Sequence, residues 1–376
     1  MKLRVPNFYN SFHCIADRCK DSCCIGWEID IDEDTYDYYQ QVDGEFGKRL
    51  RKHMCFTEDG DHSFVLQEHG RCPFLNDTNL CDICICLGEE ALSEVCTEYP
   101  RFSLDYGDVL QKCLSLSCEE VGRILFSQEE PMTFFEMEME NFVENDDEEE
   151  LSAEVIAYEQ ALVSYLESVQ NHAIALLQNR NETIGKRVFS YLEFLEMVQE
   201  DIDETEMSQE LPDIKHVEFI VLKLSKKKED MLLDSSYEDF LVRLNSLKEL
   251  EVLDFEWENV IADFERVYTK ENYQRMREEF VNSYSDSKEG FVERDYEHLL
   301  VYFTFRYFMT CAYNLEVLSY GEMAVLFTRI IMDMDVLRYH KNEKNFSRKD
   351  RIDTARIFSK EVEHSETNVE FLRVGE

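Results

Sequence analysis

Residues 14–32 read CIADRCKDSCCIGWEIDID, and this stretch sets the character of the first third of the chain. It holds four cysteines within eleven residues, and twelve of the thirteen cysteines of the 376-residue chain lie in its first 118 residues. A disulfide framework would need an oxidising compartment and usually an even number of cysteines. No apolar run near the N-terminus resembles a signal-peptide core. We therefore expect a cytoplasmic protein whose reduced thiols bind a metal or an iron–sulfur cluster.

The cysteines continue downstream among proline- and glycine-flanked turns, which bring thiolates together better than one long helix does. We predict that six of them bind metal: Cys19, Cys23, Cys24, Cys72, Cys81 and Cys96. Six exceeds the four ligands of one site, so either two of them pack behind the ligands or a second metal is bound. Neither a zinc-ribbon nor a bacterial ferredoxin spacing is present, and the spacing alone leaves the metal open.

The other cysteines have a simpler interpretation, because free cysteine often behaves as a small buried apolar residue. We expect this of Cys311, which lies alone in an apolar stretch, and of Cys55. For Cys84, Cys86 and Cys113, a packing role and a metal-ligand role fit the sequence equally well.

The composition of the chain changes near residue 130. Nine of the fifteen residues from Glu136 to Glu150 are acidic, which is typical of a linker. Beyond it Pro212 is the only proline, and apolar residues recur at helical spacing over 155–177. We predict a mainly α protein with an irregular cysteine-rich metal-binding domain in residues 1–130 and an acidic α-helical bundle in residues 131–376. Further helices are expected over 187–198, 217–224, 237–250, 260–284 and 296–313.

The formal charge of −42 excludes a nucleic-acid partner, because phosphates recruit basic proteins. A basic protein would be attracted instead. The longest apolar stretch, 299–309, is about half of the roughly 20 residues that a bilayer requires and contains Arg306, so no membrane partner is expected. Arg306 needs a carboxylate or several carbonyls if it is buried. The basic run 338–351 is interpreted as a solvated loop.

The order of these motifs resembles the bacterial flagellin lysine N-methylases. The resemblance rests on Phe12-x-Cys14-x4-Cys19-x3-Cys23-Cys24-x-Gly26-Trp27, Cys72-Pro73-Phe74-Leu75, Leu92-x3-Cys96-x2-Tyr99-Pro100-Arg101 and Leu116-Ser117-Cys118, with weaker echoes over 176–180 and 361–368. Cys14 and Cys118 fit the family as further ligand candidates. The resemblance implies transfer of a methyl group from S-adenosylmethionine to lysine side chains of flagellin. It also implies an iron–sulfur cluster, expected to be of the 4Fe–4S type, held by the N-terminal cysteines.

Binding of S-adenosylmethionine needs an unusual site here. The chain has no Gly-x-Gly, which a doubly wound methyltransferase would use in its nucleotide loop. A four-iron cluster with three cysteine ligands has an open iron that could hold the amino and carboxylate groups of the ligand, an arrangement that resembles radical S-adenosylmethionine enzymes. Their Cys-x3-Cys-x2-Cys spacing is broken here, because Gly26 takes the third position after Cys19 and Cys23. Polar and radical methyl transfer both stay open.

Five other residues are candidates for the site. Glu363 and His364 could accept the proton that a lysine must lose to become a nucleophile. The alternative for this pair is a solvated helix face with a surface histidine. Tyr99 and Arg101 adjoin the predicted ligand Cys96, and Arg101 could pair with a ligand carboxylate or form a structural ion pair. Trp27 could stack on an adenine.

A second function of a different class also fits the sequence. In it the cysteines hold structural zinc, and the acidic bundle is a non-catalytic interaction module for a basic protein. A brown, iron- and sulfide-containing protein favours the enzyme, whereas a colourless protein with stoichiometric zinc favours the module. The sequence does not define the oligomeric state.

Overall fold

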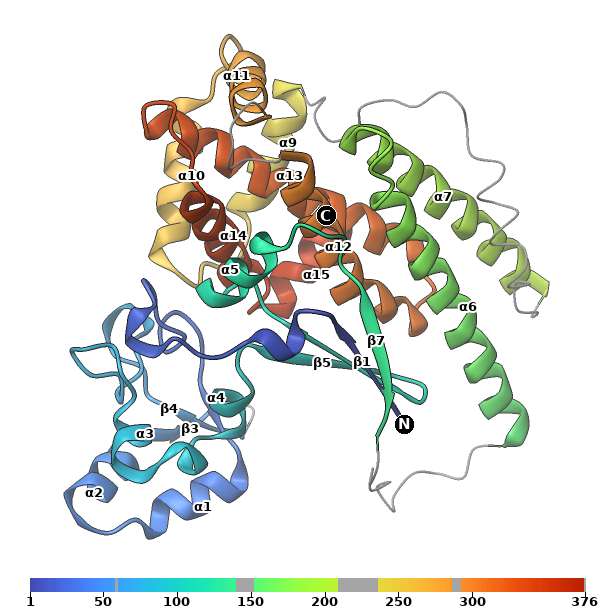
Figure 1. Ribbon diagram of the computed structural model, residues 1–376. Coiled ribbons are helices and arrows are strands. Elements are labelled where there is room, and N and C mark those ends of the chain that lie inside the picture. The colour runs from blue at the N-terminus through green and yellow to red at the C-terminus, as the bar shows by residue number, and fades with distance from the viewer. Residues whose placement is uncertain (58–59, 140–151, 209–235, 286–291, 375–376) are drawn as a thin grey trace.

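The computed structural model describes residues 1–57, 60–139, 152–208, 236–285 and 292–374 (Figure 1). A small lobe that contains most of the cysteines projects from one side of a larger body of helices. We call residues 14–57 and 60–98 the cysteine-rich lobe, and the part from α5 to α15 the helical body. A short sheet lies where the two meet.

That sheet has four strands in the order β5-β6-β1-β7. The strands are β1 (Lys2–Pro6), β5 (Arg101–Tyr106), β6 (Val109–Leu114) and β7 (Phe134–Glu138). β1 runs parallel to β6 and antiparallel to β7, while β5 and β6 form a hairpin that turns at Gly107, whose φ is 58°. Alternate residues of β6 are buried, as a strand with one face on a core requires. The sequence prediction of an irregular N-terminal domain missed this sheet.

The cysteine-rich lobe has its own small core, which includes Tyr39, Phe64 and Phe74. Its elements are β2 (Asp30–Ile31), α1 (Glu33–Gln41), α2 (Gly44–Lys52), β3 (Met54–Phe56), β4 (His62–Phe64), α3 (Asp82–Leu87) and α4 (Glu94–Glu98). Asp32 caps α1 by accepting from the Thr35 amide at 2.9 Å. Its other oxygen accepts from the Glu94 amide at 2.8 Å, so one carboxylate joins the first turns of α1 and α4.

The helical body confirms the prediction of a mainly α protein. Its helices are α5 (Glu119–Ser127), α6 (Ala153–Leu177), α7 (Ile184–Ser208), α9 (Tyr237–Lys248), α10 (Phe255–Val267), α11 (Tyr273–Ser285), α12 (Val292–Tyr307), α13 (Val317–Lys341), α14 (Arg348–Val362) and α15 (Glu366–Val374). The helix expected over 217–224 lies outside the described residues. In the described part of the chain, no helix is both long enough and apolar enough to cross a membrane.

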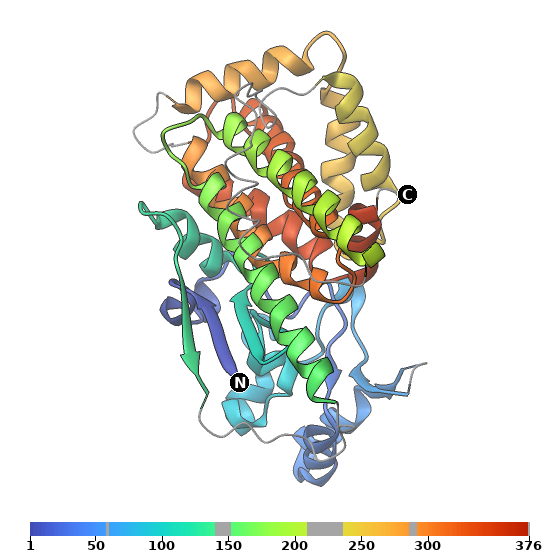
Figure 2. The same ribbon diagram turned by 90° about the vertical axis from the view of Figure 1, so that its right-hand side faces the viewer.

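Helix α13 is the centre of this body. Most of its residues are buried, and it packs against α7, α12 and α14. Gly321 allows the approach of α7, because a Cβ at this position would lie 2.2 Å from the Leu195 side chain. Figure 2 shows α6 and α7 side by side across one face of the body.

One expectation for this region was wrong, and a second was correct only in part. The single helix predicted over 260–284 is two helices, because the side chain of Asn272 accepts from the Thr269 amide and donates to the Val267 carbonyl, both at 2.8 Å, between α10 and α11. The basic run 338–351 contains the predicted exposed loop only over 342–347, because 338–341 end α13 and 348–351 begin α14. Its Arg351 is fully buried because Asp335 of α13 supplies a carboxylate for it.

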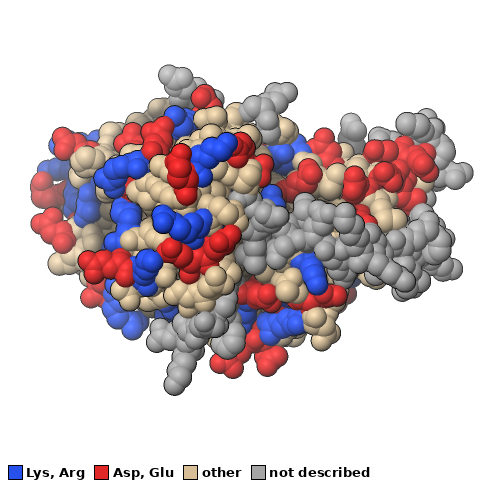
Figure 3. All heavy atoms as spheres, turned by 90° about the horizontal axis from the view of Figure 1, so that it is seen from above, with Lys and Arg blue, Asp and Glu red and all other residues tan. Residues whose placement is uncertain are grey.

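Charge is spread unevenly over the outer surface. On the face in Figure 3, acidic side chains gather at the end where α6 and α7 lie, and basic and acidic side chains alternate over the remaining helices. Exposed acidic residues of α7 include Glu196, Glu200, Asp203 and Glu204. An acidic face of this kind attracts cationic partners.

A second feature of the body is a buried charged cluster around Asp333 of α13. Its two oxygens accept from Arg243 at 2.7 Å and Arg277 at 2.6 Å, and the Tyr273 hydroxyl donates to it at 2.7 Å. A buried ion pair is costly to break because the remaining charge is left in a medium of low dielectric constant. This cluster ties α9 and α11 to the central helix.

We predict that Asp333→Ala lowers the free energy of unfolding by about 3–5 kcal/mol, because both buried guanidinium groups lose their carboxylate. Urea unfolding followed by far-UV circular dichroism measures the change. Glu200→Ala, at an exposed position of α7, is the control and should change it by less than about 0.5 kcal/mol. Equal losses in the two variants would contradict the role of the cluster.

Candidate active site

The candidate site lies where the loop that carries the first four cysteines, residues 14–24, meets α14. We call this segment the first cysteine loop, and the place where the two meet the junction. Lys360 of α14 pairs with Asp254 at 2.7 Å and with Asp21 of the loop at 3.1 Å, and Arg356 one turn earlier also pairs with Asp21. Gly26 lies against this pairing with a φ of 91°, and a Cβ there would lie 3.0 Å from Cε of Lys360. The position that holds a third cysteine in radical S-adenosylmethionine enzymes is therefore occupied here by a residue that must be glycine.

Glu363 follows α14, and its buried side chain forms an ion pair and hydrogen bonds. Its side chain has no exposed surface and pairs with Arg306, and its Oε2 accepts from the Tyr302 hydroxyl at 2.8 Å and from Ser115 Oγ at 3.4 Å. Burial alone would lower the pKa of Arg306, but the Glu363 carboxylate outweighs it and raises that pKa. Arg306 thus has the carboxylate that the sequence required. The alternative of a solvated helix face for Glu363 is wrong.

His364 is also held inside the protein. Its Nε2 lies 2.9 Å from Oγ of Ser117, and that hydroxyl lies 3.1 Å from the hydroxyl of Tyr99. Burial lowers the pKa of His364 to about 3, with the positive charges of Arg306 and Lys360 adding to the shift. The imidazole is therefore neutral at physiological pH. Among the described residues, its buried Nδ1 has no hydrogen-bond partner.

Two aromatic side chains from the N-terminal third flank this imidazole. The ring of Trp27 lies 5.2 Å from that of His364 and 5.8 Å from that of Tyr99, and Tyr99 meets His364 edge-on at 6.0 Å. The indole of Trp27 donates to the Cys23 carbonyl at 2.7 Å, which fixes the ring beside the first cysteine loop. The structure thus brings together Trp27, Tyr99 and His364, which are far apart in the sequence.

Arg101 has protein partners of its own. Its guanidinium lies 5.4 Å from the centre of the Phe12 ring, and a hydrogen bond links it to the Tyr9 hydroxyl. It therefore supports the N-terminal segment at the start of β5. Its predicted pairing with a ligand carboxylate stays a prediction.

Four thiols near Trp27 and Tyr99 influence one another's pKa or that of Tyr99: Cys14, Cys19, Cys23 and Cys118. We call them the junction thiols. Burial, followed by the Cys118 thiol, raises the pKa of Cys19 to about 12. Burial also raises the pKa of Cys118 to about 11, with Cys14 adding to it. Cys118 and Cys23 in turn raise the pKa of Tyr99 beyond the effect of burial, so these thiols lie near its hydroxyl.

Four further thiols meet inside the cysteine-rich lobe: Cys24, Cys72, Cys81 and Cys96. We call them the lobe thiols. Burial raises the pKa of Cys72 and of Cys96 to about 12, and Cys24 and Cys81 add to both shifts. The backbone joins two of the segments directly, since the Cys72 amide donates to the Cys24 carbonyl at 2.8 Å. The four come from segments 72 residues apart along the chain, from Cys24 to Cys96.

The two groups adjoin at Cys23 and Cys24, whose thiols hydrogen-bond; the bond raises the pKa of Cys23 and lowers that of Cys24 to about 7. Within the described ranges, no three His, Cys, Asp or Glu side chains are grouped so that they could hold a metal ion. Zn–S bonds of about 2.3 Å draw four thiolates to within about 4 Å of one another. The thiolates of an iron–sulfur cluster bind different iron atoms and lie further apart. The donor chemistry of both groups fits such a cluster.

The remaining cysteines divide differently. Cys311 and Cys113 are buried in the large core, which is the packing role expected for Cys311. Cys55 is exposed, so the expectation of burial was wrong; it lies on β3, an outer strand of the order β2-β4-β3. Cys84 is partly buried and Cys86 is exposed on α3. The Cys14 thiol contributes to the raised pKa of Cys84 after burial and two glutamates.

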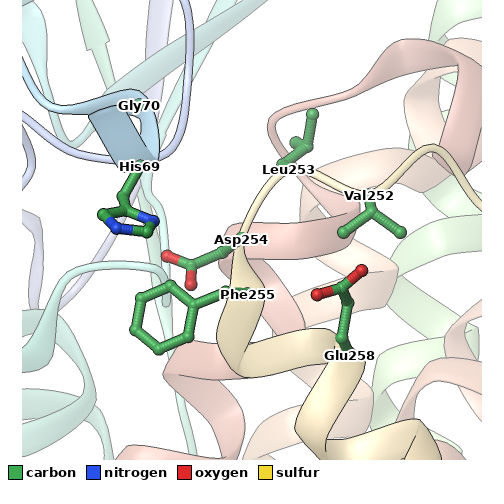
Figure 4. A pocket seen from close by; sticks show the side chains of 7 residues that line it. All are labelled: His69, Gly70, Val252, Leu253, Asp254, Phe255 and Glu258. Carbon is green, nitrogen blue, oxygen red and sulfur yellow. The ribbon is translucent and has the colours of Figure 1, made fainter. Parts of the chain in front are cut away.

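A hollow of about 230 Å³ lies between the cysteine-rich lobe and the start of α10 (Figure 4). His69 and Gly70 of the lobe form one side, and Asp254, Phe255 and Glu258 lie opposite. The rings of His69 and Phe255 are 6.2 Å apart across it. It contains none of the residues that the sequence singled out, and Asp254, whose side chain points toward His69, already pairs with Lys360.

Sequence reasoning missed three hydroxyl groups that hold the site together: Ser115, Ser117 and Tyr302. Oγ of Ser115 and Oγ of Ser117 are 2.7 Å apart, so a continuous chain of polar groups runs from Glu363 to His364. Ser117 stands inside a motif that carried the family resemblance, next to Cys118. Tyr302 precedes Arg306 by four residues and so shares a helix face with it. The place of Ser117 in that motif and the helical spacing of Tyr302 from Arg306 were the sequence signals that could have identified these residues.

Similarity to known proteins supports the resemblance to lysine N-methylases independently of the structure. Lysine-N-methylases of Salmonella typhimurium and Salmonella choleraesuis are each 29% identical over 136 residues, which are 35% of this chain and 34% of those proteins. The flagellar biosynthetic protein FliU of Salmonella muenchen is 31% identical over 126 residues, 32% of this chain and 75% of that protein. The match thus spans about a third of the length of the two lysine-N-methylases. No solved structure matches.

The C-terminal part of the chain also matches a protein family. Residues 170–374 fit the family described as the FliB lysine N-methylase C-terminal domain. This segment is more than half of the 376 residues and contains Arg306, Glu363 and His364. The chain therefore belongs to the FliB lysine N-methylase family.

Proposed function

We propose that this protein transfers methyl groups from S-adenosylmethionine to lysine side chains of flagellin in the cytoplasm, using an iron–sulfur cluster held by cysteine thiols. The family and the names of its relatives support lysine methylation in a flagellar setting. The observation that carries the proposal is the neutral His364, whose unpartnered Nδ1 lies between Trp27 and Tyr99 beside the junction thiols.

The cofactors fit the junction thiols best. An iron–sulfur cluster bound there through three cysteines would supply an open iron position for the amino and carboxylate groups of S-adenosylmethionine. The adjacent aromatic rings suit its other parts, since Trp27 can stack on an adenine and ring faces attract a positively charged sulfonium. Trp27 is already fixed to the Cys23 carbonyl, so this surface exists before the ligand binds.

The low pKa of His364 defines what the imidazole can do. A lysine ammonium has a pKa of about 10, so an imidazole with a pKa of about 3 cannot take its proton to a useful extent. We therefore assign His364 the role of a hydrogen-bond acceptor and not of a general base. With Nε2–H donating to Ser117, the Nδ1 lone pair accepts an N–H of the neutral amine and orients its nitrogen.

In the transfer itself, the lysine nitrogen forms a bond to the methyl carbon while the carbon–sulfur bond breaks. The electron pair of that bond returns to sulfur, and the product amine loses a proton to solvent. This polar route requires only that the amine arrive neutral and oriented.

Glu363 is a positioning residue in this proposal. Its oxygens already accept hydrogen bonds from Arg306, Tyr302 and Ser115, so it is not available to the substrate. It holds the end of α14, and thereby His364, against the sheet.

The surface charge supports a cationic substrate. The formal charge of −42 and the acidic end of the helical body attract a lysine-bearing protein and speed its encounter with the enzyme. Charge of this kind affects the rate of association rather than the chemistry.

We expect flagellin to gain mass when it is incubated with the anaerobically purified protein and S-adenosylmethionine. Each step of the gain should be about 14 Da, the mass added when one methyl group replaces a hydrogen. Peptide mass spectrometry should place the added mass on lysine. Flagellin incubated without S-adenosylmethionine is the control. An unchanged mass with iron-loaded protein would rule out this function.

We expect His364→Ala to lower kcat/KM by about 100-fold, because the amine loses its orienting acceptor. His364→Gln keeps an acceptor and should retain more activity, with the pH midpoint of kcat/KM unchanged, since His364 does not titrate above a pH of about 3. His172→Gln, which replaces a histidine packed against Phe194 between α6 and α7, is the matched control. Loss of an acid limb near pH 6.5 in His364→Gln would show a general base instead.

A further inference from the structure

Eight cysteines of this chain gather in two groups of four, which are the junction thiols and the lobe thiols. We propose that the lobe thiols, Cys24, Cys72, Cys81 and Cys96, bind a second and separate iron–sulfur cluster in which all four thiolates are ligands. The inference rests on the proposed function for the class of metal group. The division of the thiols is independent of it.

Backbone contacts hold three segments of the lobe group in place. The Cys72 amide donates to the Cys24 carbonyl at 2.8 Å. Leu75 bonds back to the Cys72 carbonyl at 3.1 Å and forms a β-bridge with Cys81. A ligand set held by the main chain loses little conformational freedom when metal binds, which favours binding.

The fourth ligand comes from α4 and packs against the same small core as the other three. Cys96 lies in α4, whose first turn is anchored by Asp32 through the Glu94 amide. Tyr39 is fully buried and donates to the Ala91 carbonyl at 2.6 Å. Tyr39 and Cys72 are buried in the small core of the lobe, and Cys24, Cys81 and Cys96 pack against the same core.

The junction thiols are anchored to a different part of the molecule. The Lys20 amide, next to Cys19, donates to Glu119 at 2.6 Å at the start of α5. Cys118 precedes that helix and packs against the large core, whereas all four lobe thiols belong to the small core of the lobe. One cluster takes at most four thiolates, so eight thiols in two anchored groups are more than a single cluster can use.

The two groups differ in what a cluster there can do. The lobe thiols offer four soft ligands and so leave no iron open, which suits a cluster that stabilises the fold. The small core of the lobe includes only ten buried residues among those described, and metal binding supplies folding energy where a core is small. The junction thiols lie beside Trp27 and His364, where an open iron would face a substrate.

The test is the metal content of the full chain, purified without oxygen and reconstituted with ferrous iron and sulfide. We expect about eight iron and eight sulfide per chain, twice the content of one four-iron cluster. Cys72→Ser or Cys96→Ser should each remove half of the iron, and so should Cys19→Ser or Cys118→Ser. Cys55→Ser, at an exposed position on β3, is the control and should keep all of it.

Double variants separate the groups. Cys72→Ser with Cys96→Ser should remove no more iron than either alone, because both ligate one cluster, whereas Cys72→Ser with Cys118→Ser should remove nearly all. Should a variant fold poorly, the wild-type content and two distinct electron paramagnetic resonance signals on reduction still decide the question.

About four iron per wild-type chain, all lost in variants of either group, would overturn the proposal, and so would zinc at the lobe thiols. These outcomes are distinct from failure of the proposed function. Eight iron without methylation of flagellin would leave the second cluster standing and remove the function. Methylation with four iron would do the reverse.

Discussion

The buried ion pair of Arg306 and Glu363 is the constraint on which the site depends. Two charges without solvent are tolerated only when each is well paired and hydrogen-bonded. Arg306 also lies 3.5 Å from the centre of the Phe102 ring of β5, and Tyr302 bonds both Glu363 and the Leu116 amide. The pair therefore joins α12, the end of α14 and the sheet, and it determines where the next residue, His364, must lie.

The N-terminal third reaches this pair through a second set of charges. Lys360 and Arg356 of α14 hold Asp21, and the glycine at position 26 lets the loop lie against the Lys360 side chain. The distance between Trp27 and His364 thus follows from ion pairs one turn away, and not from any contact between the two residues alone. The C-terminal part, which matches the family, and the N-terminal part, which carries the cysteine motifs, therefore each supply residues to the same site.

The features that the sequence predicted correctly are those determined by residues close together in the chain. Helical spacing over 155–177 found α6, and the requirement of Arg306 for a carboxylate was correct. The sheet was missed because β1 pairs with strands more than a hundred residues away, and no local pattern encodes such pairing. The Glu363–Arg306 pair and the two groups of thiols were not predictable for the same reason: each is formed by segments that only the fold brings together.

The charges around the site are compatible with the proposed reaction of a neutral amine in an acidic protein. The outside of the molecule attracts a cation, but the positive charges nearest His364 are Arg306 and Lys360, and both help to keep the imidazole uncharged. The same two charges disfavour an ammonium at the same point, since a like charge lowers the pKa of an amine. In the proposed reaction, a lysine drawn in by the acidic surface would therefore meet an interior that favours its deprotonated form. That form is the nucleophile which methyl transfer needs.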